Sequence, residues 1–137
     1  MIIDESTSSA VLSVAASPEQ LRVLRAYVRA VATHRGLAAD DLADLVLAVD
    51  EAASTLLDHT NPLSVLTCAF DVDPGNRLRV HLTATTTEPI DHSATSFGWF
   101  VLHTLVDAVT VEHIRTPHEL ERWDVAIILT KALHAKA

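Results

Sequence analysis

The spacing of hydrophobic residues changes several times along this chain, and each spacing predicts a helix or a strand. Residues 10–16 alternate between apolar and polar and predict a first strand. Residues 17–34 predict a helix, with Ser17 as its cap and Pro18 in its first turn. A second helix is predicted over 40–59. Its apolar stripe repeats at spacings of three and four and consists of Leu42, Leu45, Val46, Val49, Ala53 and Leu56.

Two alternating segments follow, over residues 64–72 and 77–85, and predict a β-hairpin. The side chains expected to face inward are Leu66, Cys68, Phe70, Val72, Leu78, Val80, Leu82 and Ala84. Between the strands, residues 73–76 have Pro74 at the second position and Gly75 at the third. This pattern predicts a type II turn.

The last third of the chain predicts a loop over 85–96, a helix over 97–106 and strands over 108–114 and 121–133. The third helix is expected to turn Phe100, Val101 and Leu105 inward. The order is therefore β-α-α-β-β-α-β-β. It predicts an α+β two-layer sandwich with a mostly antiparallel sheet and helices on one face.

At 137 residues, the chain is expected to form one domain over 9–137, with 1–8 as a flexible N-terminal tail. Ten Lys and Arg against eighteen Asp and Glu give a net charge of −8, which disfavours binding to nucleic acid or to an anionic membrane. There is no apolar run of membrane-spanning length, no secretory signal pattern and only one cysteine. The expected location is the cytoplasm.

Three arginines, Arg22, Arg25 and Arg29, share one face of the first predicted helix. One interpretation is a solvated face with extended side chains. The other is a docking face for an acidic partner, because arginine makes directed contacts with carboxylates.

The second helix contains LVLAVDEAAST, in which Glu51, Thr55 and Asp58 share a face. With PEQLRVLRAYVRAV before it and FVLHTLVDAVTV after the third loop, the chain resembles the RsbW and SpoIIAB family, most closely its UsfX-like anti-sigma-F branch. Members of that family are anti-sigma factors and also serine kinases. The resemblance implies the Bergerat fold, which is that of the histidine-kinase-like (GHKL) ATPases.

The resemblance also implies a nucleotide site, and its positions are altered here. Glu51 stands at the catalytic glutamate, but Thr55 replaces the asparagine that binds magnesium. Ala84 replaces the aspartate that recognises adenine, and Thr86 replaces the first glycine that follows it. The family has two phosphate-binding glycines before the third helix. Here Ser96 replaces the first of them, and Gly98 keeps the second. We therefore expect no cofactor, with ATP and magnesium bound only if the degenerate pocket still functions.

In the resembling family the sigma factor contacts an arginine 26 positions before the catalytic glutamate, and that position here is Arg25. This agreement favours Arg22, Arg25 and Arg29 as the partner-binding residues. The implied partners are an alternative sigma factor, a STAS anti-anti-sigma factor that releases it, and a second copy of the chain. Two alternatives stay open. One is an active serine kinase with Glu51 as base and Thr55 on the metal, and the other is a pseudokinase-like homodimer with a different regulatory partner.

Other reactive residues give weaker patterns. The eight histidines are dispersed, and only His113 and His118, beside two glutamates, faintly suggest a metal; none is expected. Cys68 is expected in the core. Trp99 and Trp123 are expected to fill the core or a dimer interface, with the alternative that Trp99 fills the space where adenine would bind.

Overall fold

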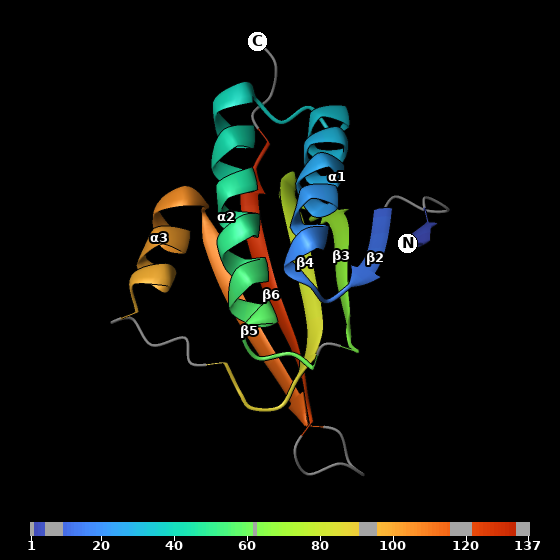
Figure 1. The fold of residues 1–137 in the computed structure, drawn as a ribbon. Coiled ribbons are helices and arrows are strands. Elements are labelled where there is room, and N and C mark those ends of the chain that lie inside the picture. The colour runs from blue at the N-terminus through green and yellow to red at the C-terminus, as the bar shows by residue number, and fades with distance from the viewer. Residues whose placement is uncertain (1, 5–9, 62, 91–95, 116–121, 134–137) are drawn as a thin grey trace.

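A six-stranded sheet carries three α-helices on one face in the computed structural model, which describes residues 2–4, 10–61, 63–90, 96–115 and 122–133 (Figure 1). The strands are β1 (Ile2–Asp4), β2 (Ala10–Ala15), β3 (Val65–Val72), β4 (Arg77–Thr86), β5 (Ala108–Arg115) and β6 (Trp123–Ala132). The helices are a 3₁₀ turn (Pro18–Gln20), α1 (Leu21–His34), α2 (Ala39–Leu57) and α3 (Phe97–Leu105).

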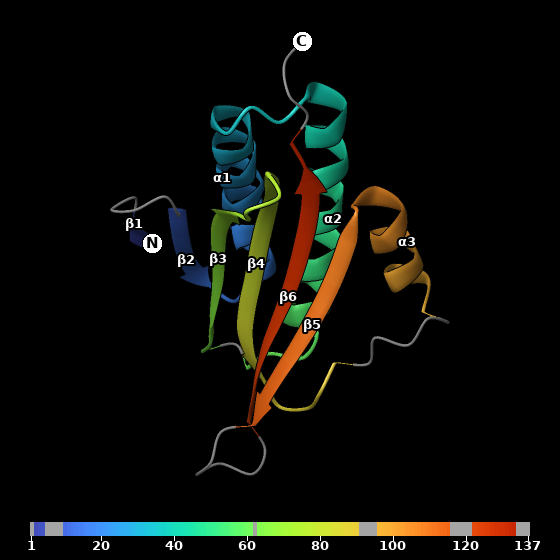
Figure 2. The ribbon, with the colours of Figure 1, turned by 180° about the vertical axis from the view of Figure 1, so that it is seen from behind.

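The sheet has the strand order β1-β2-β3-β4-β6-β5, and all neighbouring strands are antiparallel. The longest pairing joins β4 to β6, from Arg77 opposite Ala132 to Thr86 opposite Trp123. Figure 2 shows the face of the sheet that no helix covers. The predicted two-layer α+β sandwich is confirmed.

The core lies between the sheet and the helices, because alternate strand residues meet the apolar stripes of α1 and α2. The predicted inward residues of β3 and β4 are buried, apart from Val72, which is half-buried. Cys68 is 1% exposed, and burial raises the pKa of its thiol, as expected of a small core residue. The largest fully buried side chains include Leu12, Leu24, Leu45, Leu56, Phe70, Leu82, Ile127 and Leu129.

The N-terminal residues differ from the prediction of a flexible tail. Residues 2–4 form β1, in which Ile2 lies opposite Ser13 and Asp4 opposite Val11. The backbone of β2 would otherwise be an open sheet edge, and β1 satisfies its hydrogen-bonding groups. Residues 5–9 lie outside the described residues, so the division into tail and domain stays a prediction for them.

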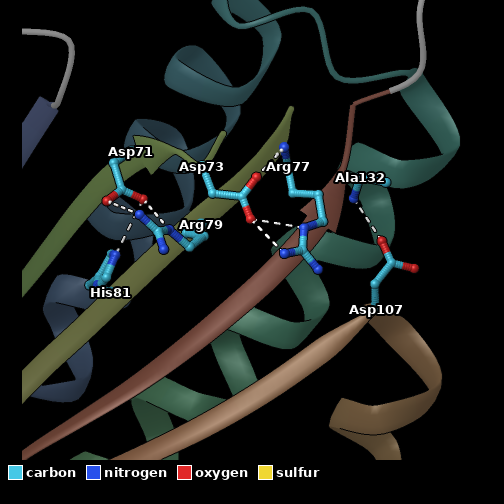
Figure 3. A network of polar contacts seen from close by, with 7 residues as sticks. All are labelled: Asp71, Asp73, Arg77, Arg79, His81, Asp107 and Ala132. Carbon is cyan, nitrogen blue, oxygen red and sulfur yellow. Dashed lines mark hydrogen bonds and ion pairs between the residues drawn. The ribbon is translucent and has the colours of Figure 1, made fainter. Parts of the chain in front are cut away.

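The hairpin between β3 and β4 does not have the predicted type II turn. Asn76 adopts a left-handed φ of 60°, whereas Gly75 does not have a positive φ. The Asn76 amide donates to the Asp73 carbonyl oxygen at 3.0 Å, and the buried Asp73 carboxylate accepts from the Arg77 amide at 2.9 Å (Figure 3). This arrangement is a type I turn followed by a left-handed residue, which asparagine tolerates. The Asp73 side chain therefore decides the turn.

The same hairpin carries an ionic cluster on the helix-free face (Figure 3). Arg79 donates from Nε and Nη2 to the Asp71 carboxylate at 2.7 and 2.8 Å, and His81 Nε2 lies 3.4 Å from the same group. Partial burial raises the pKa of Asp71, but the contacts with Arg79 and His81 outweigh it and hold the pKa below its ordinary value. The cluster links β3 to β4 across their shared register.

Two helices and one strand differ in detail from the prediction. The helix α2, expected to reach residue 59, ends at Leu57, and the strand β4 extends through Thr86 into the predicted loop. In α3, Phe100 was expected inward but is 62% exposed, while Trp99 and Leu102 are buried. Val101 and Leu105, also expected inward, are half-buried, and Leu105 packs against the core, so the buried face is shifted from the predicted one toward Trp99 and Leu102. Trp99 belongs to the core, as predicted.

Candidate functional site

α2 lies between α1 and α3, so its two sides serve two different surfaces (Figure 1). Consecutive helical residues are about 100° apart. Asp50 therefore reaches α1, where it contacts Arg25, while the next residue, Glu51, reaches the first turn of α3. Glu51 and the predicted partner-binding arginines of α1 thus lie on opposite sides of α2.

Glu51 and Gly98 are in direct contact. A side chain at position 98 would collide with the Glu51 carboxylate, which occupies the space above this glycine. Ser96 is at the N-cap position of the same helix, without a side-chain cap hydrogen bond. The structure therefore brings Glu51 next to Ser96 and Gly98, which lie far from it in the sequence. The lack of a side chain at Gly98 makes room for Glu51 itself.

Thr55 uses its hydroxyl group within α2. Its Oγ1 donates to the Glu51 carbonyl oxygen at 2.9 Å, the usual back-bonding of a threonine in a helix. One turn later, His59 Nδ1 lies 3.0 Å from the Thr55 carbonyl oxygen. Thr55 thus stands one turn from Glu51, but it has neither the length nor the amide of an asparagine.

Ala84 and Thr86 lie in β4 and are buried, at 4% and 1% exposure. Ala84 has no side-chain acceptor for an adenine amino group. The Thr86 hydroxyl donates to the Glu88 carbonyl oxygen at 2.6 Å, and the next amide, that of Thr87, donates to the His59 carbonyl oxygen at 3.1 Å. The segment after β4 is therefore attached to the end of α2 by β-type pairing rather than forming a glycine-rich lid.

These residues do not fit a magnesium nucleotide. The position for adenine recognition has no acceptor, the position for the metal ligand has a back-bonded hydroxyl, and Glu51 fills the space beside the remaining glycine. In the described part of the chain, no group of three or more His, Cys, Asp or Glu side chains is placed to hold a metal. Of the faint histidine pair, His113 accepts a hydrogen bond from the Ile90 amide at 3.1 Å, and His118 lies outside the described residues.

The arginine face of α1 is partly engaged by α2. Arg25 Nη1 donates to Asp50 Oδ1 at 2.9 Å, and both side chains are 36% exposed. Arg22 and Arg29 are exposed, and the structure gives neither of them an acidic partner within the described ranges. The three arginines therefore share a face, but only the middle one is held in place by an ion pair.

Sequence analysis missed Asp50 as the partner of Arg25. The two residues are 25 positions apart, so no local spacing connects them. The residue after Asp50, Glu51, was the one interpreted as functional, because it matches the catalytic glutamate of the resembling family. A helical projection of α2 separates them, because Asp50 falls on the flank next to Val46 and Ala53, and Glu51 on the other.

A hollow of about 460 Å³ lies apart from these residues, between the segment after α2 and the ends of β3, β4 and β6. Its wall is rich in hydroxyl groups, and neither Glu51 nor Gly98 lines it. The lining residues are Asn61, Leu63, Ser64, Val65, Thr67, Thr83, Ala84, Thr85, Arg122 and Asp124. The predicted nucleotide positions therefore do not converge on this hollow, which shares only Ala84 with them.

Comparison with known proteins places the fold. The sequence profile of the histidine kinase-like ATPase domain family matches residues 14–121. The chain belongs to this family. The predicted histidine-kinase-like fold is thus confirmed, while the assignment of Glu51 to the position of the catalytic glutamate stays a prediction.

Two kinds of relative are RsbW proteins or contain an RsbW domain. The Anti-sigma-F factor RsbW of Mycobacterium tuberculosis, in two strains, is 38% identical over 103 residues, which are 74% of this chain and 60% of the relative. The chain thus spans about three fifths of the relative's length. The solved RsbU and RsbW domains of another M. tuberculosis protein superpose with a TM-score of 0.65 at 18% identity, covering 93% of this chain and 33% of that one. These similarities agree with the predicted resemblance to RsbW-type proteins.

A membrane-spanning helix would need a long apolar segment. None of the helices in the described residues is long and apolar enough to cross a membrane.

Proposed function

We propose that this chain is an anti-sigma factor that sequesters an alternative sigma factor of the sigma-F or sigma-B type. A STAS anti-anti-sigma partner would release the sigma factor by competing for an overlapping surface. The similarity to a protein named Anti-sigma-F factor RsbW supports this proposal. The site of action would be the cytoplasm, where sigma factors meet RNA polymerase.

The observation that carries the proposal is the arginine face of α1. A chain with a net charge of −8 exposes Arg22 and Arg29 on one helix surface, with Arg25 between them. Guanidinium groups form directed, charge-assisted hydrogen bonds with carboxylates. The surface therefore suits an acidic protein segment, and Arg25 is the position that the resemblance assigns to sigma-factor contact.

Regulation by mutual exclusion does not require nucleotide chemistry. The residues at the nucleotide positions do not fit a magnesium nucleotide, so we propose partner switching in which sigma factor and STAS protein exclude each other sterically. A homodimer of this chain is also proposed, on the resemblance alone. Dimer formation would set how many sigma factors bind per dimer, but the sigma factor and the STAS protein would still compete for the same surface.

Replacement of Arg25 by alanine tests the proposed function. We expect the dissociation constant for the sigma factor to rise at least tenfold, because the variant loses charge-assisted hydrogen bonds at the centre of the arginine face. The measurement is titration calorimetry with purified alternative sigma factors of the same organism. Arg122→Ala, outside α1 and α2, is the control and should bind as the wild type does. An unchanged dissociation constant in Arg25→Ala would sink the proposal.

The alternative is an active serine kinase, and the placement of Glu51 against the first turn of α3 is the observation that favours it. Calorimetry with ATP and ADP in the presence of magnesium separates the two functions. We expect no binding heat at near-millimolar nucleotide. Binding at micromolar concentration, with phosphate transfer to a STAS protein that disappears in Glu51→Gln, would establish the kinase instead.

A further inference from the structure

α1 and α2 together expose one large hydrophobic side chain, that of Leu47, which is 58% exposed; every residue of both helices is described. Leu47 lies one turn before Asp50 on α2, so the two side chains are neighbours on the same helix surface. The buried stripe of α2 does not need Leu47, because Leu45, Val46, Ala48 and Val49 fill the core around it. An isolated exposed leucine is ordinary, but this one stands beside the arginine face.

The Arg25–Asp50 contact fixes how the two helices align. α1 and α2 are joined at one end and run antiparallel (Figure 1). One turn after Arg25 in α1 is Arg29, and one turn before Asp50 in α2 is Leu47. These two residues therefore lie level with each other along the helix pair. Leu47 is thus bordered on the α1 side by the Arg25–Asp50 pair and by Arg29, and on the α3 side by Asp44 and Glu51, each one turn away on α2.

Asp50 also determines how Arg25 is presented. The pair shares a single contact, from Nη1 to Oδ1, so the other guanidinium donors of Arg25 are not used by Asp50. With both side chains more than a third exposed, the pair contributes little to folding stability. Its effect is to hold the long Arg25 side chain against α2 at Asp50, one turn from Leu47, which reduces the ordering that a partner must impose.

We propose that the docking surface for the sigma factor extends from α1 onto α2, with Leu47 as its apolar centre. The inference rests on the proposed anti-sigma function. The segment that fits is a helix of the sigma factor that places one large apolar side chain on Leu47 and carboxylates beside Arg22 and Arg29. Charge complementarity with the exposed arginines and continuity with the arginine face both specify this occupant.

The other exposed apolar residues of the helix layer do not define such a partner. Phe97 and Phe100 are 79% and 62% exposed on α3, on the other flank of α2. The arginine face is on α1, so these phenylalanines are separated from the charges that specify an acidic segment. Leu47 instead lies one turn from the Arg25–Asp50 contact and level with Arg29.

Truncation of Leu47 tests the inference, with Leu63 as the matched control. Leu63 is 92% exposed but follows α2 instead of lying beside the arginines. We expect Leu47→Ala to raise the dissociation constant for the purified sigma factor at least tenfold, and Leu63→Ala to leave it within twofold. Thermal unfolding should show both variants folded like the wild type, because neither leucine is in the core.

The salt dependence gives a second readout. The loss caused by Leu47→Ala should persist at high ionic strength, since an apolar contact is not screened, whereas the loss caused by Arg29→Ala should shrink. If Arg25→Ala weakens binding but Leu47→Ala behaves like Leu63→Ala, the inference is wrong and the proposed function stands. If no alternative sigma factor of the organism binds the wild-type chain, the proposed function fails and this inference fails with it.

Discussion

Phe70→Ala is expected to lower the free energy of unfolding by about 3–5 kcal/mol, the range for truncating a buried phenylalanine. The ring is fully buried in β3, under the helices. Its neighbours in the sheet are Ala10 on β2 and Val80 on β4, and the Tyr27 ring from α1 meets its ring edge to face at a centroid distance of 5.8 Å. Ala10 and Val80 are small and held in the sheet by strand pairing, so they cannot move in to fill the space, and most of the cavity would remain.

Phe100→Ala is the matched control, because it removes the same side chain from an exposed position on α3. We expect a change within about 0.5 kcal/mol, as for surface substitutions in general. Urea unfolding with comparison of midpoints and m-values measures both variants. Equal losses in the two variants would mean that Phe100 is buried, and would restore the orientation of α3 that the sequence pattern predicts.

The strands could be predicted because their periodicity is simple. Residues alternate between the core and the helix-free face in β3 and β4, and the buried set from Leu66 to Ala84 follows directly from that pattern. The apolar stripe of α2 could be predicted equally well, because most polar residues of this helix occupy the opposite side. A face can be read from sequence wherever polar and apolar residues separate cleanly.

The orientation of α3 could not be predicted for the opposite reason. FGWFVLHTL is apolar on nearly every side, so no face of the helix is favoured by its own residues. The contact between Glu51 and Gly98 and the packing of Trp99 set its rotation, and both depend on the tertiary fold. β1 was missed because three residues are too few to show a period.

In the candidate site, too, the sequence predicts which residues share a helix face, but the contacts between helices come only from the structure. The spacing of Arg22, Arg25 and Arg29 places them on one helix face, and the resemblance singles out Arg25. Which of the three is held by an ion pair depends on how α1 and α2 pack, and only the structure shows that Asp50 reaches Arg25. The relation of Leu47 to this face depends on the same packing, since Leu47 by itself is one more leucine in a leucine-rich helix.

Reversal of the two flanking arginines is expected to have the largest effect on partner binding. We expect Arg22→Glu with Arg29→Glu to raise the dissociation constant for the sigma factor by about a hundredfold or more, because each tenfold change is about 1.4 kcal/mol and like charges placed against one another cost several kcal/mol. Both side chains are exposed, so the fold should be unaffected.

The kinetics should show where the loss arises. Each reversal adds two negative charges to a chain whose net charge is already −8, so an acidic partner would be repelled before contact. The association rate should therefore fall, and the wild-type rate should decline with salt while that of the double variant should not. Arg122→Glu, a reversal at an exposed arginine before β6, is the control for net charge.

The control decides between a local surface and a general charge effect. If Arg122→Glu slows association as much as a single reversal at Arg29, the acidic balance of the whole chain governs encounter and the arginine face has no special role. If Arg122→Glu binds like the wild type while Arg29→Glu does not, the partner meets the chain at α1. In that case the exposed arginines steer the acidic segment, and Arg25, already held across α2 by Asp50, is in position to bind it on arrival.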